Sequence, residues 1–192
     1  DQETQAPKKL DWSMLRQGSF LGLFAIAFIY NGVAWSLLGW IALFMQDSAN
    51  FSTILSLSTV SIFYVALTAG RFLCASVADW LGHIKLLTIL AFGIAITYPL
   101  VVFSGDPWWI VIGVFFTGLS LSGLFPTALA YGAQRYPEQT GTMTGILNVA
   151  MTIGTMLPPL WTGIIADAWN FQAALGVNYG MVLILVAVVL YL

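Results

Sequence analysis

The stretch LLTILAFGIAITYPLVVF, from Leu86 to Phe103, runs for eighteen residues without a charged side chain. An α-helix rises about 1.5 Å per residue, so this stretch covers most of the ~30 Å hydrocarbon layer of a bilayer. Lys85 stands directly before the stretch, and Asp106 follows shortly after it. The stretch therefore predicts a helix that crosses a membrane, with its polar flanks at the two surfaces.

Apolar stretches of this kind fill most of the chain. We count six of them, at about Gly18 to Met45, Ser52 to Ala78, Leu86 to Phe103, Trp108 to Gly132, Thr142 to Ala166 and Ala173 to Leu192. Charged residues make up 7% of the 192 residues and hydrophobic residues 59%, and the mean hydropathy is +0.90. This composition excludes a soluble domain and predicts an all-α membrane protein. We expect residues 1–17 to form a cytoplasmic tail or linker and residues 18–192 a six-helix transmembrane bundle.

The basic residues outside these stretches predict the orientation in the membrane. They are Lys8, Lys9, Arg16, Lys85 and Arg135, which fall before the first stretch and in the second and fourth gaps. The first, third and fifth gaps hold no Lys or Arg and carry Asp47, Asp106 and Asp167 instead. By the positive-inside rule, both termini lie in the cytoplasm of a multi-pass protein of the cell (inner) membrane.

Several classes of function are disfavoured by what the sequence lacks. A net charge of −2 without a basic run gives no sign of nucleic-acid binding. Cys74 lies inside an apolar stretch and is interpreted as a packing residue. We find no cofactor motif, no group of metal ligands and no catalytic residues. The chain starts at Asp1 and stops at Leu192 without a basic flank, so we expect it to be a piece of a longer protein.

A short internal match suggests a repeat. Ala75-Ser-Val-Ala-Asp79 closes the second stretch, and Gly163-Ile-Ile-Ala-Asp167 closes the fifth. The offset of 88 residues contains three stretches, so the two copies end on opposite sides of the membrane. We therefore predict a 3+3 inverted repeat, an arrangement common in secondary transporters. The alternative is that Ala-Asp merely ends two unrelated helices.

The first stretch contains a polar and aromatic patch, Tyr30-Asn31-Gly32-Val33-Ala34-Trp35-Ser36. Asn31 and Trp35 are spaced i, i+4 and share one helix face. An aromatic plane beside an amide suits a hydroxylated ring such as a sugar. Packing of helices through Gly32, Ser36 and Gly39 is an equally open alternative.

The fourth and fifth stretches repeat this theme. Phe125-Pro126 follows a run of Gly and Ser from Gly118, and bent or broken helices commonly flank a binding cavity. Asn148 and Thr152 share a face, ahead of Pro158-Pro159. We expect a polar substrate cavity lined by Tyr30, Asn31, Trp35, Phe125, Asn148 and Thr152. For Gly118, Gly123, Gly145 and Gly154, close helix packing is the favoured interpretation.

Arg71 is the basic residue that lies well within a stretch, eight residues before Asp79. A cation at that depth must snorkel to the surface, pair, or line a wet cavity, and a structural role and a substrate or gate contact both remain open. No Asp, Glu or His occupies the middle of a stretch. The sequence thus shows no proton carrier, so coupling resides elsewhere or the transport is passive.

The loop after the second stretch carries a family resemblance. Ala75-x-x-x-Asp79-Trp80-x-Gly82-His83-Ile84-Lys85 resembles the G-x-x-x-D-R-x-G-R-R/K loop of the major facilitator superfamily, and Gly70-Arg71 resembles a pair common in the preceding helix. Trp80 and His83 stand where Arg is usual. The resemblance implies the C-terminal six-helix half of such a transporter, with gating roles for Arg71, Asp79, Gly82 and Lys85.

A second resemblance concerns the branch. Gly118 to Pro126, Tyr136-Pro137-Glu138 and the first stretch are similar to the fucose and glucose permease branch, although Ala34 stands where some members have an acid. This implies a symporter or uniporter that moves a small polar organic solute, such as a sugar, by alternating access together with a second six-helix half. The alternatives are a stand-alone half that assembles with itself or with another half, and a channel, although no filter motif is present.

The topology can be tested by placing single cysteines at positions 106 and 138. We expect an impermeant thiol reagent added outside the cell to label a cysteine replacing Asp106 and to spare one replacing Glu138, because the basic residues place the fourth gap in the cytoplasm. Labelling of position 138 with sparing of position 106 would reverse the orientation.

Overall fold

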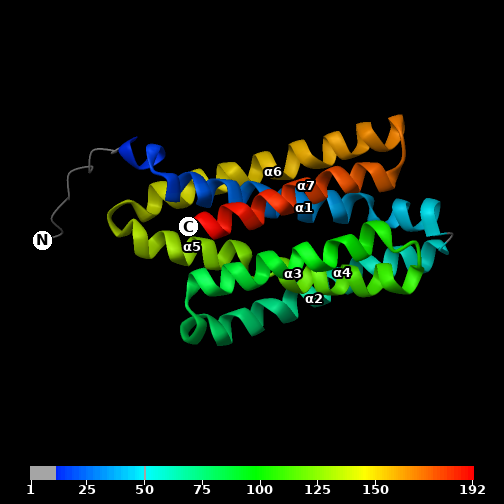
Figure 1. Cartoon of the computed structure of the whole chain (residues 1–192), viewed down its shortest axis with the longest axis horizontal. Helices are drawn as coiled ribbons and strands as arrows, with labels where there is room; N and C mark the ends of the chain where they lie inside the picture. The colour runs from blue at the N-terminus through cyan, green and yellow to red at the C-terminus, as the bar shows by residue number, and fades with distance from the viewer. Residues whose placement is uncertain (1–11, 50) are drawn as a thin grey trace, which may run out of the picture.

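The computed structural model describes residues 12–49 and 51–192 as helices joined by short turns. The elements of this described part are η1 (Trp12–Arg16), α1 (Gly18–Ala49), α2 (Thr53–Leu81), α3 (His83–Phe103), α4 (Pro107–Leu121), α5 (Leu124–Arg135), η2 (Pro137–Gln139), α6 (Thr140–Ala168) and α7 (Phe171–Tyr191). Figure 1 shows α1, α6 and α7 on one side of an elongated bundle and α2, α3 and α4 on the other. Most of the predicted tail, residues 1–11, lies outside the described residues.

The structure confirms six helices that are long and apolar enough to cross a membrane, with α4 and α5 together forming the fourth. Two predicted gaps are shorter than expected. The first helix continues through Gln46 to Ala49, and the second continues through Asp79 to Leu81. Polar residues near a helix end can extend beyond the hydrocarbon layer while the backbone remains helical, so the apolar pattern understates helix length.

The turns follow from their capping residues. Ser52, Asp106 and Asn170 each accept a hydrogen bond from a backbone N–H in the first turn of the following helix. Gly82 separates α2 from α3 with φ +79°, a conformation that side chains other than glycine rarely adopt. Near η2, the Tyr136 ring packs edge-on against Phe20, and burial raises the pKa of its phenol.

The packing confirms the inverted repeat. The first helix of each triplet lies along the second helix of the other, α1 on α6 and α4 on α2, while α3 packs against α7. This exchange is what a two-fold axis in the membrane plane produces. Asp79, at the end of α2, and Asp167, at the end of α6, lie at opposite ends of the bundle, as Figure 1 shows from the helix directions.

Both exchanged contacts rely on glycine. A Cβ on Gly154 of α6 would overlap the Phe28 carbonyl oxygen of α1, and a Cβ on Gly118 of α4 would lie 2.9 Å from the Phe63 carbonyl oxygen of α2. Close packing is thus confirmed for these two glycines and for Gly123, where a Cβ would meet Cys74. It is wrong for Gly145, which has nothing within 4 Å of that position.

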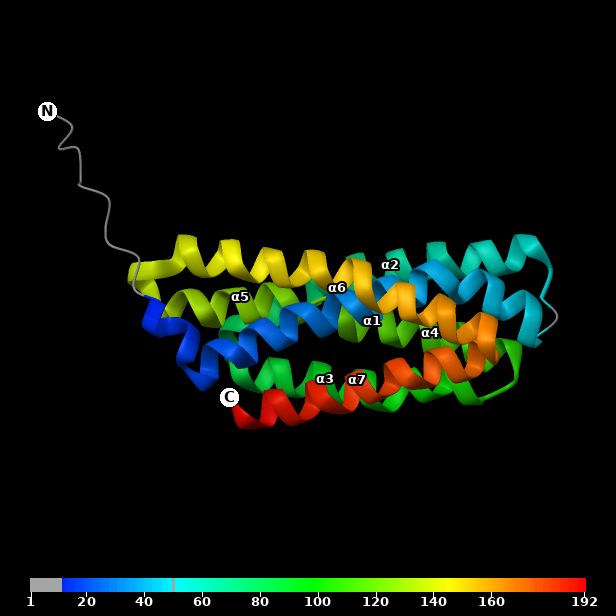
Figure 2. The same ribbon diagram turned by 90° about the horizontal axis from the view of Figure 1, so that it is seen from above.

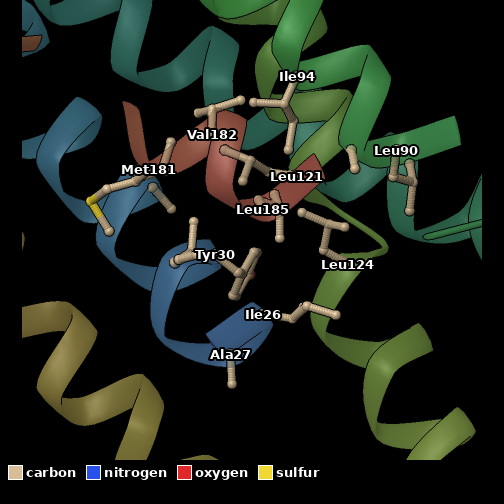
Figure 3. Packing of buried hydrophobic residues seen from close by; sticks show 14 of the residues in the cluster. Ile26, Ala27, Tyr30, Leu90, Ile94, Leu121, Leu124, Met181, Val182 and Leu185 are labelled. Atoms are coloured by element: carbon tan, nitrogen blue, oxygen red, sulfur yellow. The ribbon is translucent and has the colours of Figure 1, made fainter. Parts of the chain in front are cut away.

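Apolar side chains fill the centre between the two layers, as Figure 3 shows for Tyr30, Ile94, Leu121, Val182 and Leu185. Figure 2 shows α3 and α7 side by side along one edge of the bundle.

A polar cluster joins α6 to α7 inside the bundle. The fully buried Asn178 accepts a hydrogen bond from Trp161 Nε1 (2.9 Å) and donates one to Thr162 Oγ1 (2.8 Å). On the neighbouring α3, the Tyr98 hydroxyl donates to the Leu175 carbonyl of α7 (3.3 Å). Each of these buried polar groups has a partner, as burial in a membrane bundle requires.

Gly154→Ala should destabilise the fold by about 1 to 3 kcal/mol, because the added methyl group meets backbone atoms of α1 that cannot rotate away. Gly145→Ala on the same helix is the matched control, since its methyl group enters open space. Thermal unfolding of the purified protein in detergent measures both. Equal melting temperatures for the two variants would contradict the assigned contact.

Candidate functional site

A hydrogen-bonded cluster joins α1 to α6 where the two helices cross. Asn31 Nδ2 donates to the Met151 carbonyl oxygen (2.9 Å) and to Thr155 Oγ1 (2.7 Å). The Thr155 hydroxyl donates in turn to the Met151 carbonyl (3.0 Å). Asn31 is 8% exposed, so this cluster is largely buried between the two helices. This Asn31 contact with Thr155 was not predicted.

The polar surface continues along α6 toward its N-terminal end. Asn148 and Thr152 are exposed, and the Thr152 hydroxyl donates to the Asn148 carbonyl (2.9 Å). With about 3.6 residues per turn, Thr152 and Thr155 lie one and two turns after Asn148 on the same side of the helix. We call Asn31, Trp35, Asn148, Thr152 and Thr155 the polar edge. Asn31 is buried in the contact between the two helices, and Thr155 is half-buried. Trp35, Asn148 and Thr152 are exposed and face out of the six-helix bundle.

The predicted cavity residues separate into two groups. Trp35 is 44% exposed, and it follows Asn31 by one turn along α1. Tyr30 instead is 6% exposed and stacks on Phe125 of α5, with ring centroids 6.1 Å apart and an interplanar angle of 14°. The structure thus joins Tyr30 to Phe125 and Asn31 to Thr155, with Asn148 and Thr152 further along α6. Thr155 follows Thr152 at i, i+3 on the same helix face, and this spacing could have identified Thr155 from the sequence.

The prolines of α6 change the hydrogen bonding next to the polar edge. Pro158 and Pro159 have no N–H, so the carbonyls of Gly154 and Thr155 lack their usual helical donors. Beyond the prolines, Trp40 Nε1 of α1 donates to the Pro159 carbonyl (3.0 Å). α1 therefore holds α6 on both sides of this irregular turn.

A separate cavity lies near the C-terminal end of α2. Its volume is about 230 Å³, and Arg71, His83 and Thr127 are among its lining residues. It opens where the helix breaks at Ser122-Gly123, because α2 packs along α4 but hardly touches α5. The break confirms the predicted interruption of the fourth span. Around the cavity, Arg71, Asp79 and Lys85 are exposed, and within the described part of the chain no ion pair joins them.

Comparisons with known proteins agree with this fold. The model of the Major Facilitator Superfamily matches residues 86–192. The Glucose/mannose transporter GlcP of Bacillus subtilis (strain 168) is 24% identical over 88% of this chain and 42% of its own length. Major facilitator superfamily domain-containing protein 4A of Mus musculus is 29% identical over 62% of this chain and 24% of its own length.

A solved structure gives the same result at the level of fold. The crystal structure of FucP, a Major Facilitator Superfamily transporter in the outward conformation, matches with a TM-score of 0.84 at 15% identity, over 98% of this chain and 46% of that one. The chain spans less than half the length of the relatives it matches.

Thr155→Val should lower the free energy of unfolding by about 1 to 3 kcal/mol, because it leaves an amide hydrogen of the nearly buried Asn31 without an acceptor. Thr152→Val is the matched control on the same helix face. It removes only an exposed bond within α6, so its effect should stay within about 0.5 kcal/mol. Unfolding in detergent, followed by circular dichroism, compares the two. A larger loss at Thr152 would contradict this account.

Proposed function

The chain belongs to the major facilitator superfamily, and from this premise we propose that it is one of two six-helix bundles of a secondary transporter. The complete transporter would move a small polar organic solute, a sugar being the favoured class, by alternating access. The second bundle belongs to the same chain or to another one. We propose a multi-pass location in the cell (inner) membrane with both termini in the cytoplasm.

The polar edge is the observation that carries this proposal. Asn148 and Thr152 are exposed on a membrane-spanning helix, on the turns that precede the contact of Thr155 with Asn31. Trp35 is exposed one turn after Asn31 on α1. Hydrocarbon offers such groups no hydrogen-bond partners, so polar groups at this depth face a watery cavity or another protein. Because the polar edge faces out of its own bundle, it supplies half of a site that a second bundle would complete.

The chemistry of the polar edge favours a neutral solute. It contains amides, hydroxyls and an indole but no basic side chain, so an anion would find no counter-charge there. GlcP, named as a glucose and mannose transporter, makes these two sugars the first solutes to test. No Asp, Glu or His lies at the polar edge, so uptake without a proton gradient is expected unless the second bundle supplies a carrier.

The cavity beside Arg71 supports a gating role for the cytoplasmic end of α2. The exposed Asp79 and Lys85 flank a short turn at Gly82, and Arg71 lines the cavity about two turns before Asp79 on α2. No ion pair within the described part of the chain neutralises these three residues. Charges left unpaired at one end of a bundle are suited to pair with a second bundle in one conformation and to separate in the other. We therefore assign Arg71, Asp79, Gly82 and Lys85 to the cytoplasmic gate.

Uptake by proteoliposomes containing the complete transporter tests the proposal, with D-glucose, D-mannose, a nucleoside and a carboxylate as solutes. Asn31→Ala or Asn148→Ala should reduce sugar uptake by about 5- to 150-fold, the equivalent of roughly 1 to 3 kcal/mol for a lost buried hydrogen bond.

Ser58→Ala is the matched control, since the Ser58 hydroxyl bonds only within α2 at an exposed position. The proposal fails if neither sugar enters the wild-type vesicles. If both Asn variants transport at the wild-type rate while folded, the polar edge is removed from the site and Arg71 becomes the better candidate.

A further inference from the structure

Resting on the proposed function, we infer that Asn31 binds the solute through its amide oxygen, which accepts a hydrogen bond, and offers the solute no donor. The solute group that docks there must donate a hydrogen bond, as a sugar hydroxyl does. A group that can only accept, such as a carbonyl, an ether or a carboxylate, is rejected at this point. The hydrogen bonds that Asn31 already makes leave its amide oxygen as the group that faces the solute.

The amide nitrogen of Asn31 is turned toward two acceptors of α6. The Met151 carbonyl cannot donate, so the amide atom that faces it must be the nitrogen, and the N/O assignment of Asn31 is fixed. The Thr155 hydroxyl has placed its own hydrogen on the Met151 carbonyl, so toward Asn31 it can only accept. Both acceptors lie on the nitrogen side of the amide, so the side of Asn31 that carries Oδ1 can only accept.

The remaining polar atom of Asn31 is its amide oxygen, Oδ1. It has no hydrogen-bond partner among the described residues. It is also not sealed inside, since the buried side-chain atoms without a partner in the described part are Ser36 Oγ and Tyr136 Oη. Asn31 Oδ1 is therefore an accessible acceptor on a membrane-spanning helix, held in place by two hydrogen bonds on its other side.

The neighbouring groups show the same bias. The Thr152 hydroxyl has placed its hydrogen on the Asn148 carbonyl, so only its lone pairs remain. The Trp35 indole and the Asn148 amide still offer donors, and they lie one turn or more from Asn31 along their helices. At Asn31 itself, the polar edge thus offers the acceptor Oδ1.

A solute group that can only accept, placed against Asn31 Oδ1, would leave two unpaired acceptors facing each other. Sites built to hydrogen-bond one partner type discriminate strongly against analogues that lack it. We expect a penalty of about 10- to 100-fold in apparent affinity, in line with the cost of an unsatisfied buried polar group.

The experiment uses the complete transporter in proteoliposomes and measures how D-glucose analogues inhibit D-glucose uptake. In each analogue, fluorine replaces one hydroxyl group, because fluorine is similar in size but cannot donate. At one position of the sugar, the fluoro analogue should bind about 10- to 100-fold more weakly than D-glucose to the wild type. The same substitution should carry no penalty in Asn31→Ala, while Ser58→Ala should retain the wild-type pattern.

Thr155→Val provides a second test in which Asn31 is retained. The amide hydrogen that it frees faces the α1–α6 contact and not the solute, so the fluoro penalty should stay as in the wild type. Equal fluoro penalties in the wild type and Asn31→Ala, or loss of the penalty in Thr155→Val, would overturn the inference and leave the proposed function intact. Absence of uptake of both D-glucose and D-mannose by the wild type would overturn the proposed function, and this inference with it.

Discussion

The architecture depends on how closely the backbones of exchanged helices approach. Gly154 meets the Phe28 carbonyl where α6 crosses α1, and Gly118 meets the Phe63 carbonyl where α4 crosses α2. In a bilayer, helices gain little from the hydrophobic effect, so short-range packing between small residues must hold them together. These crossings fix the depth at which Asn31 faces Thr155, and a bulkier residue there would separate the hydrogen-bonding partners.

The membrane-crossing segments were predictable because the hydrocarbon thickness fixes the length of a spanning helix, and because charged side chains are costly where water is absent. Because charged residues are confined to the ends of the spans, the matching pairs Ala78-Asp79 and Ala166-Asp167 at two helix ends indicated the inverted repeat. The site was less predictable, since helical spacing gives a face but not its neighbour. Spacing paired Asn31 with Trp35, whereas the Asn31 hydrogen bonds run to α6. Similarly, spacing could not tell that Gly145 faces open space while Gly154 is in contact.

Two regions of the molecule differ in how tightly they are held. α1 has its inner surface covered by α6, α7 and parts of α2 and α5, whereas α2 is largely exposed along its length. The cavity at Arg71 forms where α5 departs from α2 after the break at Ser122-Gly123. The proposed gate therefore lies on a loosely packed helix, whereas Asn31 of the proposed solute site lies on the tightly packed α1. Such a division lets charges rearrange while the acceptor geometry at Asn31 stays constant.

The double proline of α6 has a mechanical consequence. A helix that loses two consecutive donors is a natural place to flex, yet here the turn is fastened to α1 below by Asn31 and above by Trp40. Farther along, the Trp161–Asn178–Thr162 contacts fasten it to α7. Hydrogen bonds from α1 thus support α6 across the turn that contains the two prolines. We therefore expect α1 and α6 to tilt together when the transporter changes conformation.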